Sequence, residues 1–317
     1  MQIDELKQLA SRTRATREAG IALLLASLVL ALFLFIPLSP EQVASAPAAV
    51  VLASTTPDSA FANVPIEAKA AIVYDLATKQ VLYAKNADAQ LPLASLTKLL
   101  TMYAAFSELS PTTSITIPED VMGLSAPHAF TPGQQFALGD LARITLTASL
   151  NDGAAAIAEA VAAQEGTSIH DALASAAQSL GLTETYAVNG NGLDMNTAIS
   201  GGYGSPRDIA VLAGALVAKA PEVAAATTHP TASAVDSAGQ SFSVKNTDPV
   251  VANLPHLLLS KTGYTDLADG NLALVFDVGI GHPVAVVVLG SSQDARFTDG
   301  QALVAATLAH FAGVPSL

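Results

Sequence analysis

A long apolar segment near the amino end restricts where this chain can fold. No charged residue occurs from Gly20 to Pro40, and a helix of about 20 apolar residues can cross the roughly 30 Å hydrocarbon core of a bilayer. Four basic side chains precede the segment, namely Lys7, Arg12, Arg14 and Arg17. Because basic flanks stay on the cytoplasmic side, we expect a cytoplasmic tail over residues 1–19, a single-pass membrane anchor over residues 20–38, and the rest of the chain on the extracytoplasmic face of the cell membrane.

The alternative interpretation of the segment is a cleaved signal peptide, whose apolar run is usually about 7–15 residues. The run here is longer, and Pro47 directly follows Ala44-Ser45-Ala46, the stretch that could be cleaved. A retained anchor is therefore favoured, and both interpretations send the remainder across the membrane. Residues 39–66 are rich in Ala, Ser, Pro and Thr, which is typical of a flexible linker. We expect the folded domain to occupy residues 67–314.

Composition argues against several kinds of partner. A formal net charge of −13 disfavours a nucleic acid, which would need a basic face, and broad adsorption to anionic lipid. The absence of cysteine excludes disulfides, thiolate metal sites and cysteine nucleophiles. The six histidines are scattered, with no HExxH pattern or close pair, so we expect neither a metal site nor a cofactor.

Hydrophobic patterning predicts strands at both ends of the folded region and helices between them. Ala71–Asp75 and Gln80–Ala84 are short apolar runs separated by a turn, which indicates a β-hairpin. A helix is expected to begin near Ser95, and residues 139–220 are helical by pattern. Later segments predict three strands and a final helix, over residues 257–263, 271–278, 283–290 and 298–312.

This order favours an α/β fold in which an antiparallel sheet flanked by helices is built from both ends of the domain. We expect residues 67–105 and 235–314 to form this α/β part. Residues 106–234 then form an inserted lobe that is mainly or entirely helical.

Three short motifs suggest an active site. They are Ser95-Leu96-Thr97-Lys98, Ser149-Leu150-Asn151 and Lys261-Thr262-Gly263, and each pattern occurs once. Taken singly, each has a simple structural explanation, because the serines can cap helices and a lysine at a strand end can be solvated. All three in this order, each on a suitable element, are a strong signal.

The residue types in these motifs fit nucleophilic catalysis by serine. A serine hydroxyl needs a base to take its proton, and Ser95 and Lys98 share one face of the predicted helix. Lys98 can be that base only when neutral, and burial or a second cation lowers a lysine pKa. Lys261 is the candidate for that cation. An unpaired N–H at the helix start and the N–H of Tyr264 could then stabilise an oxyanion.

With these motifs the chain resembles the low-molecular-mass penicillin-binding proteins, the serine D-alanyl-D-alanine carboxypeptidases. The segments ITIPED, LGLTET, NGNGLD and SKTGYTD are also similar to segments of that family, and the resemblance covers about residues 67–313. It implies the penicillin-binding/β-lactamase-like transpeptidase fold. It also implies peptidoglycan stem peptides ending in D-Ala-D-Ala as substrates and β-lactams as covalent inhibitors.

The same resemblance implies a role for each motif residue. Ser95 would be acylated with Lys98 as its base, Ser149 would relay a proton to the leaving group, and Asn151 would orient Lys98 and hold the substrate amide. The terminal carboxylate would be held by Lys261, Thr262 and Thr265. Gly263 and Tyr264 would line the strand on which the substrate lies.

Some positions depart from the family pattern. Leu150 stands where glycine is common, and Tyr264 stands where histidine is often found. The carboxylate-binding arginine of some relatives has no clear match; Arg296 is a candidate, although a surface salt bridge is the favoured interpretation of that residue.

Alternative functions on the same fold remain. A serine β-lactamase of class A would need a glutamate that activates water, and neither Glu165 nor Glu184 lies in an ExxLN context. A D,D-endopeptidase or transpeptidase would act on the same bond type. A non-catalytic β-lactam-binding protein is the remaining alternative.

Overall fold

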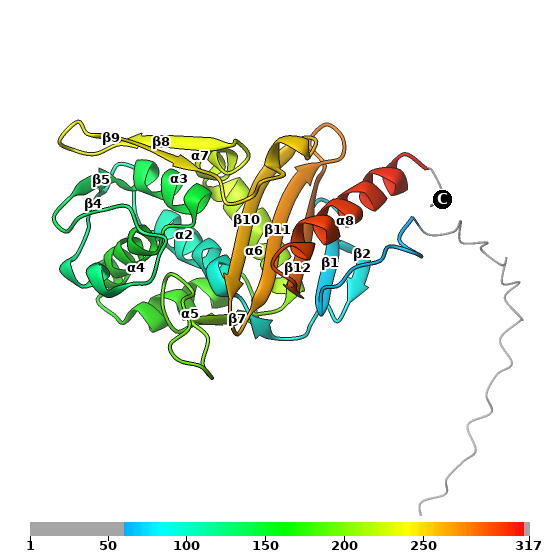
Figure 1. Cartoon of the computed structure of the whole chain (residues 1–317), viewed down its shortest axis with the longest axis horizontal. Helices are drawn as coiled ribbons and strands as arrows, with labels where there is room; N and C mark the ends of the chain where they lie inside the picture. Colours follow the sequence, from blue (N-terminus) through cyan, green and yellow to red (C-terminus); the bar gives the residue numbers. More distant parts are fainter. Residues whose placement is uncertain (1–59, 314–317) are drawn as a thin grey trace, which may run out of the picture. The chain divides into compact units, whose positions relative to one another are not determined.

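The structure, a computed structural model, describes residues 60–313 and is built on a five-stranded antiparallel sheet. The strand order is β10-β11-β12-β1-β2. The strands are β1 Ala70–Asp75, β2 Gln80–Lys85, β10 Leu257–Thr265, β11 Asp269–Asp277 and β12 Pro283–Ser291. Ile72 of β1 lies opposite Val287 of β12, so the two ends of the domain meet in the sheet (Figure 1). The predicted hairpin, the three late strands and the α/β fold are confirmed.

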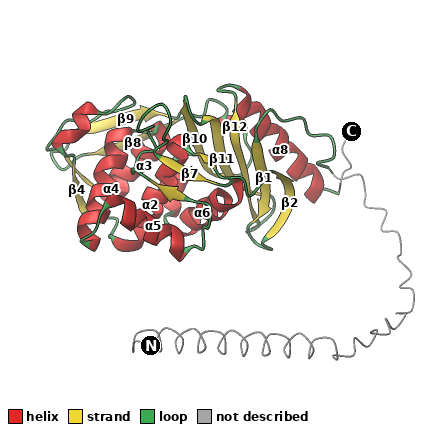
Figure 2. Ribbon diagram, turned by 90° about the horizontal axis from the view of Figure 1, so that it is seen from below, coloured by secondary structure: helices red, strands yellow, loops and turns green. Residues whose placement is uncertain are grey.

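Helices cover both faces of this sheet because its strands are apolar on both sides. Successive side chains of a strand point to opposite faces: Val286 belongs to the core formed with α8 (Ala295–Phe311), whereas Val287 belongs to the core that includes α6 (Pro206–Lys219). Figure 2 shows the sheet between α8 and the other helices. This explains why β12 is almost continuously hydrophobic although its neighbours are antiparallel.

The remaining helices form a lobe beside α6. They are α2 Thr97–Glu108, α3 Leu138–Ala148, α4 Asn151–Glu165, α5 Ile169–Ser179 and α7 Pro221–Ala226. Local sequence explains where several of them begin. The Ser168 side chain accepts a hydrogen bond from the Asp171 N–H at the start of α5, and Ser205 caps α6 in the same way, with Pro206 in its first turn. Although α6 lies within the predicted insertion, it packs on the central sheet.

The lobe is mainly helical but also contains strands that the sequence did not predict. Two small sheets are formed by β4 Ser114–Thr116 with β5 Gln135–Ala137, and by β8 Thr231–Val235 with β9 Ser241–Lys245. A third joins β3 Leu91–Pro92, β7 Gly202–Gly204 and β6 Tyr186–Ala187. An all-helical insertion is therefore wrong in detail. Strands of two or three residues are too short to show periodicity, whereas β8 and β9 alternate over five residues each and could have been recognised.

Residues 182–205 are a second departure, because the expected helical pattern from 139 to 220 is interrupted there. This segment contains β6, β7 and irregular backbone. Gly192 has φ +80°, and a Cβ at this position would lie 1.9 Å from the Ala94 carbonyl oxygen. Gly192 therefore serves a close approach to the turn that carries Ser95, and glycine disfavours a helix.

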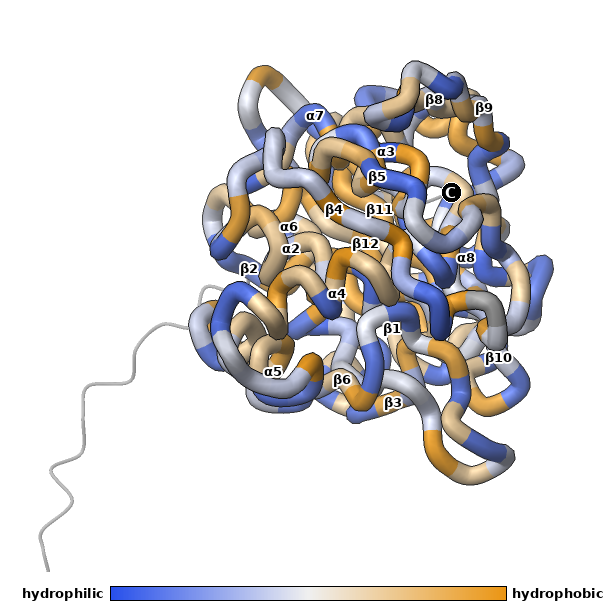
Figure 3. Tube along the Cα trace, turned by 90° about the vertical axis from the view of Figure 1, so that its left-hand side faces the viewer, coloured by the Kyte–Doolittle hydropathy of each residue, from blue (hydrophilic) through white to orange (hydrophobic). Residues whose placement is uncertain are grey.

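The predicted linker and anchor fall largely outside the described residues. Phe61, near the end of the predicted linker, is 6% exposed and packs against Tyr83 and His310, so packing begins before residue 67. Within residues 60–313 no helix has the length and apolar character needed to span a bilayer. Figure 3 shows hydrophilic and hydrophobic residues distributed along the described part of the chain. The predicted anchor at residues 20–38 lies outside the described residues.

Replacement of Asp299 should destabilise the sheet–α8 layer. This buried carboxylate accepts hydrogen bonds from the Glu67 and Ala68 N–H groups and from the Ser291 hydroxyl. We expect Asp299→Ala to lower the free energy of unfolding by about 2–4 kcal/mol, because a buried N–H loses its charged acceptor. Urea unfolding followed by circular dichroism measures this. The exposed Asp294, whose side chain does not cap the helix, is the control; an equal loss for Asp294→Ala would contradict the assignment.

Candidate active site

Ser95 lies on a strained turn at the start of α2. It is the middle residue of a 3₁₀ turn, Ala94–Leu96, that leads directly into that helix. Ala94 has φ +47°, a left-handed conformation that costs a residue with a Cβ free energy. Ser95 is partly exposed while both of its neighbours are buried. The turn therefore presents the hydroxyl from an otherwise buried segment.

Lys98 lies one turn further along and is completely buried. Its Nζ is 2.9 Å from Ser95 Oγ, 2.8 Å from Asn151 Oδ1 and 2.6 Å from the Asn191 carbonyl oxygen. The two carbonyl oxygens can only accept hydrogen bonds. A neutral lysine amine has two N–H donors and one lone pair, so the donors satisfy these oxygens and the lone pair is left for the Ser95 hydroxyl proton.

The environment of Lys98 favours this neutral form. Burial lowers the pKa of Lys98 well below its usual value, and the charge of Lys261 lowers it further, while Asp152 acts in the opposite direction. No carboxylate lies within ion-pair distance of either lysine among residues 60–313. The predicted effect of Lys261 on the base is therefore supported, although burial contributes more.

Ser149 and Lys261 form a second hydrogen-bonded pair. Lys261 Nζ donates to Ser149 Oγ at 2.9 Å and to the Thr262 carbonyl oxygen at 2.7 Å. Burial, followed by the charge of Arg296, lowers the pKa of Lys261 to about 7. Ser149 has φ +59° at the junction of α3 and α4, and this junction places Asn151 at the start of α4. All three predicted motifs thus meet around one point.

Strand β10 passes directly in front of the nucleophile turn. A Cβ at Gly263 would lie 2.9 Å from the Leu93 carbonyl oxygen and 3.3 Å from Ser95 N, so only glycine fits without displacing the turn. β10 is also the edge strand of the sheet. Its free edge can pair with an extended peptide, and the next residue, Tyr264, is exposed.

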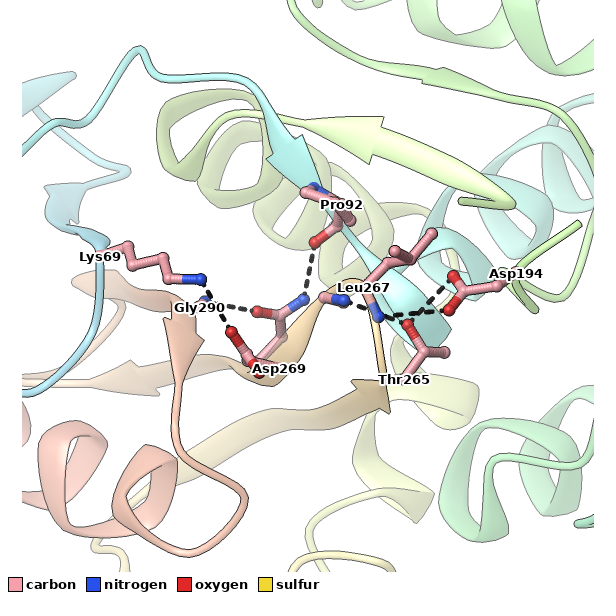
Figure 4. A network of polar contacts seen from close by, with 9 residues as sticks. Lys69, Pro92, Asp194, Thr265, Leu267, Asp269 and Gly290 are labelled. Atoms are coloured by element: carbon pink, nitrogen blue, oxygen red, sulfur yellow. Dashed lines mark hydrogen bonds and ion pairs between the residues drawn. The ribbon is translucent and has the colours of Figure 1, made fainter. Parts of the chain in front are cut away.

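The threonines near Gly263 have partners within the protein. Thr262 Oγ1 is 2.6 Å from the Thr247 hydroxyl. Thr265 Oγ1 donates to Asp194 Oδ1 at 3.1 Å, and Asp194 also accepts from the Leu267 N–H (Figure 4). The Thr265 hydroxyl, expected to bind a substrate carboxylate, therefore already uses its single proton.

Arg296 requires a correction. The residue is 8% exposed and its Nη1 donates to the Gly263 carbonyl oxygen at 2.6 Å, so the favoured interpretation as a surface salt bridge is wrong. Arg296 Nε is buried and has no hydrogen-bond partner within the described part of the chain. The residue lies behind the Lys261–Gly263 motif, where its charge lowers the pKa of Lys261.

Sequence reasoning missed several contributors to the site. Asn191 acts through its backbone carbonyl, which no side-chain motif reveals. Thr247 and Asp194 are distant in sequence from the residues of β10 that they contact, so only the folded chain brings them to the site. The Asn-Gly pattern around residues 189–192 was a usable signal, since it predicts a turn rather than a helix.

Comparisons with known proteins agree with this geometry. A family model described as D-alanyl-D-alanine carboxypeptidase matches residues 54–293. The chain is 32% identical over 169 residues to the D-alanyl-D-alanine carboxypeptidase DacC of Escherichia coli, which is 50% of this chain and 41% of that protein. It is 27% identical over 236 residues to the D-alanyl-D-alanine carboxypeptidase DacF of Bacillus subtilis, and the match covers 73% of this chain and 59% of DacF. The chain thus spans only about half the length of these curated relatives.

A solved structure is similar over almost its whole length. Penicillin-binding protein D2 of Listeria monocytogenes, in its ampicillin-bound form, matches with a TM-score of 0.66 and 26% identity, covering 77% of this chain and 98% of that one. The family match covers most of the described domain, and the three motifs converge within it. This chain therefore belongs to the D-alanyl-D-alanine carboxypeptidase family.

Proposed function

We propose that this protein is a serine D-alanyl-D-alanine carboxypeptidase that removes the terminal D-alanine from peptidoglycan stem peptides. The observation that carries the proposal is the 2.9 Å contact between Lys98 Nζ and Ser95 Oγ. Two carbonyl oxygens occupy the other hydrogen-bonding positions of the amine. A serine activated in this way can form an acyl-enzyme.

Acylation proceeds in two proton-coupled steps. Ser95 Oγ attacks the carbonyl carbon of the penultimate D-alanine as its proton moves to Lys98 Nζ, and the oxyanion is stabilised by the N–H groups of Ser95 and Tyr264. The C–N bond then breaks as the proton that Lys98 accepted passes through the Ser149 hydroxyl, which contacts Lys261, to the leaving amine, so that D-alanine departs and Lys98 is neutral again. Water attacks the resulting ester with Lys98 as base, which restores Ser95 and releases the shortened peptide.

The leaving D-alanine carries a carboxylate, for which the other side of the site is suited. Lys261 supplies a cation, and Thr262 can donate its proton to the carboxylate while accepting one from Thr247. Arg296 adds positive charge behind Gly263. Thr265 would join this group only by giving up its bond to Asp194. Recognition of a free carboxylate favours cleavage at a C-terminus over cleavage within a chain.

Two assays on the same protein test the proposal. A penicillin should form an ester on Ser95, detected by mass spectrometry and peptide mapping, and an N-acetylated peptide ending in D-Ala-D-Ala should release free D-alanine. Ser95→Ala is the control and should do neither. An adduct on another residue would refute the site, and rapid penicillin hydrolysis without D-alanine release would indicate a β-lactamase instead.

The state of Lys261 predicts a pH dependence of substrate binding. Its pKa is lowered to about 7, so the ammonium that attracts the carboxylate is lost as pH rises through this value. We expect KM for an N-acetylated peptide to rise above about pH 7, by up to ~10-fold per pH unit if the charge is essential. Lys261→Arg keeps its charge over this range, so its KM should stay flat from pH 6 to 9. A flat wild-type profile would contradict this role.

The apolar segment supports an anchored, extracytoplasmic enzyme, with the lipid bilayer as a partner through residues 20–38. A reporter that is active only in the cytoplasm, fused after Leu317, should be silent, because the catalytic domain is outside. The same reporter placed before the segment should be active and serves as the control. Strong activity of the C-terminal fusion would exclude this topology, and N-terminal sequencing of the mature protein would report whether the anchor is retained.

A further inference from the structure

The loop of residues 188–201 is held together by its own hydrogen bonds. The N–H groups of Val188 and Asn189 both donate to the Gly201 carbonyl oxygen. Asn189 Oδ1 accepts from the Gly192 N–H at 2.7 Å, and its Nδ2 donates to the Leu193 carbonyl oxygen at 2.9 Å. These bonds fix the segment between Asn189 and Asp194 as a unit.

This loop contacts two separate parts of the active site. The Asn191 carbonyl oxygen accepts from Lys98 Nζ at 2.6 Å, in contact with the base. Three residues later, the Asp194 carboxylate accepts from Thr265 Oγ1 at 3.1 Å and from the Leu267 N–H at 3.3 Å. Asp194 therefore joins the loop beside the base to the end of β10 and the turn that follows it (Figure 4).

The Thr265 hydroxyl makes two hydrogen bonds within the protein. It has one proton, which Asp194 accepts, and its oxygen accepts in turn from the Ala268 N–H at 3.2 Å. Asp194 and Thr265 together thus satisfy two backbone N–H groups of the turn between β10 and β11. The hydroxyl acts as a structural bridge in this arrangement and has no further proton for a ligand.

We propose that Asp194 is a positioning residue that, through Thr265 and the following turn, fixes the edge strand β10 relative to Ser95. Gly263 holds one side of this stretch of strand against the nucleophile turn, and Asp194 holds the other side at Thr265. Tyr264, whose N–H is the second oxyanion donor of the proposed mechanism, lies between these two fixed points. Without Asp194 the donor is free to shift, and a displacement of about 1 Å can cost roughly 100-fold in rate.

This inference rests on the proposed function, and acylation by a penicillin tests it. In the full-length protein, stopped-flow measurements with a fluorescent penicillin separate the binding constant from the acylation rate at saturation. We expect Asp194→Ala to lower the saturating acylation rate roughly 10–100-fold with a smaller change in binding. Asp266→Ala is the matched control: it removes an equal charge from the turn that Asp194 contacts, but Asp266 is exposed, and we expect a change within about twofold.

A double-mutant cycle shows whether Asp194 acts through Thr265. In a Thr265→Val background, the fold reduction in the saturating acylation rate caused by Asp194→Ala should be at least fivefold smaller than in the wild type. Equal costs in both backgrounds, or an unchanged acylation rate for Asp194→Ala alone, would overturn the proposal. If Asp194→Ala does not fold, as judged by circular dichroism, Asp194→Asn takes its place in the cycle with the same criteria. Failure of the wild type itself to be acylated would refute the proposed function rather than this role.

Discussion

The burial of Lys98 with no acidic partner in the described domain is the constraint around which the site is arranged. A charged ammonium in such a place would be strongly destabilising, and neighbouring Lys261, itself buried, adds repulsion. The amine can remain there because, when neutral, it satisfies two carbonyl acceptors and still offers a lone pair. Those acceptors, Asn151 Oδ1 and the Asn191 carbonyl, come from different elements. The condition that makes lysine a base therefore also ties the start of α4 and a surface loop to α2.

The close contacts of the site depend on where the chain can approach itself. Gly263 lets β10 lie against the nucleophile turn, and Gly192 lets the loop beside Lys98 lie against the same turn from another direction. At both positions a Cβ would overlap backbone atoms, which cannot move aside as a flexible side chain can. The turn that carries Ser95 is thus fixed between a strand and a loop. This fixation is what a reacting hydroxyl needs, because small misplacements are costly.

The sequence predicted elements with strong local signals and missed those that depend on distant contacts. The hairpin, the helix that begins with Ser205-Pro206 and the three motif positions follow from periodicity, capping and residue chemistry, all of which are local. The β8–β9 hairpin was missed although its strands alternate over five residues each, because Ala and Ser give a weak hydrophobic signal. Residues 182–205 were missed because their glycines serve contacts with α2 rather than a repeating pattern. Arg296 looked like a surface residue, since nothing near it in sequence shows that Gly263 lies above it. Asp194 likewise acquires its role only when the loop meets β10.

The site also concentrates features that oppose stability. Two buried lysines have no acidic partner within residues 60–313. Ala94 and Ser149 adopt left-handed backbone at φ +47° and +59°, which costs about 1–2 kcal/mol for each such residue. These costs are offset by the central sheet, whose strands bury apolar residues on both faces between α6 and α8. The strained residues lie outside the sheet because the sheet presents only its edge strand, β10, to the site. Strain at the nucleophile is therefore borne by residues next to a well-packed layer.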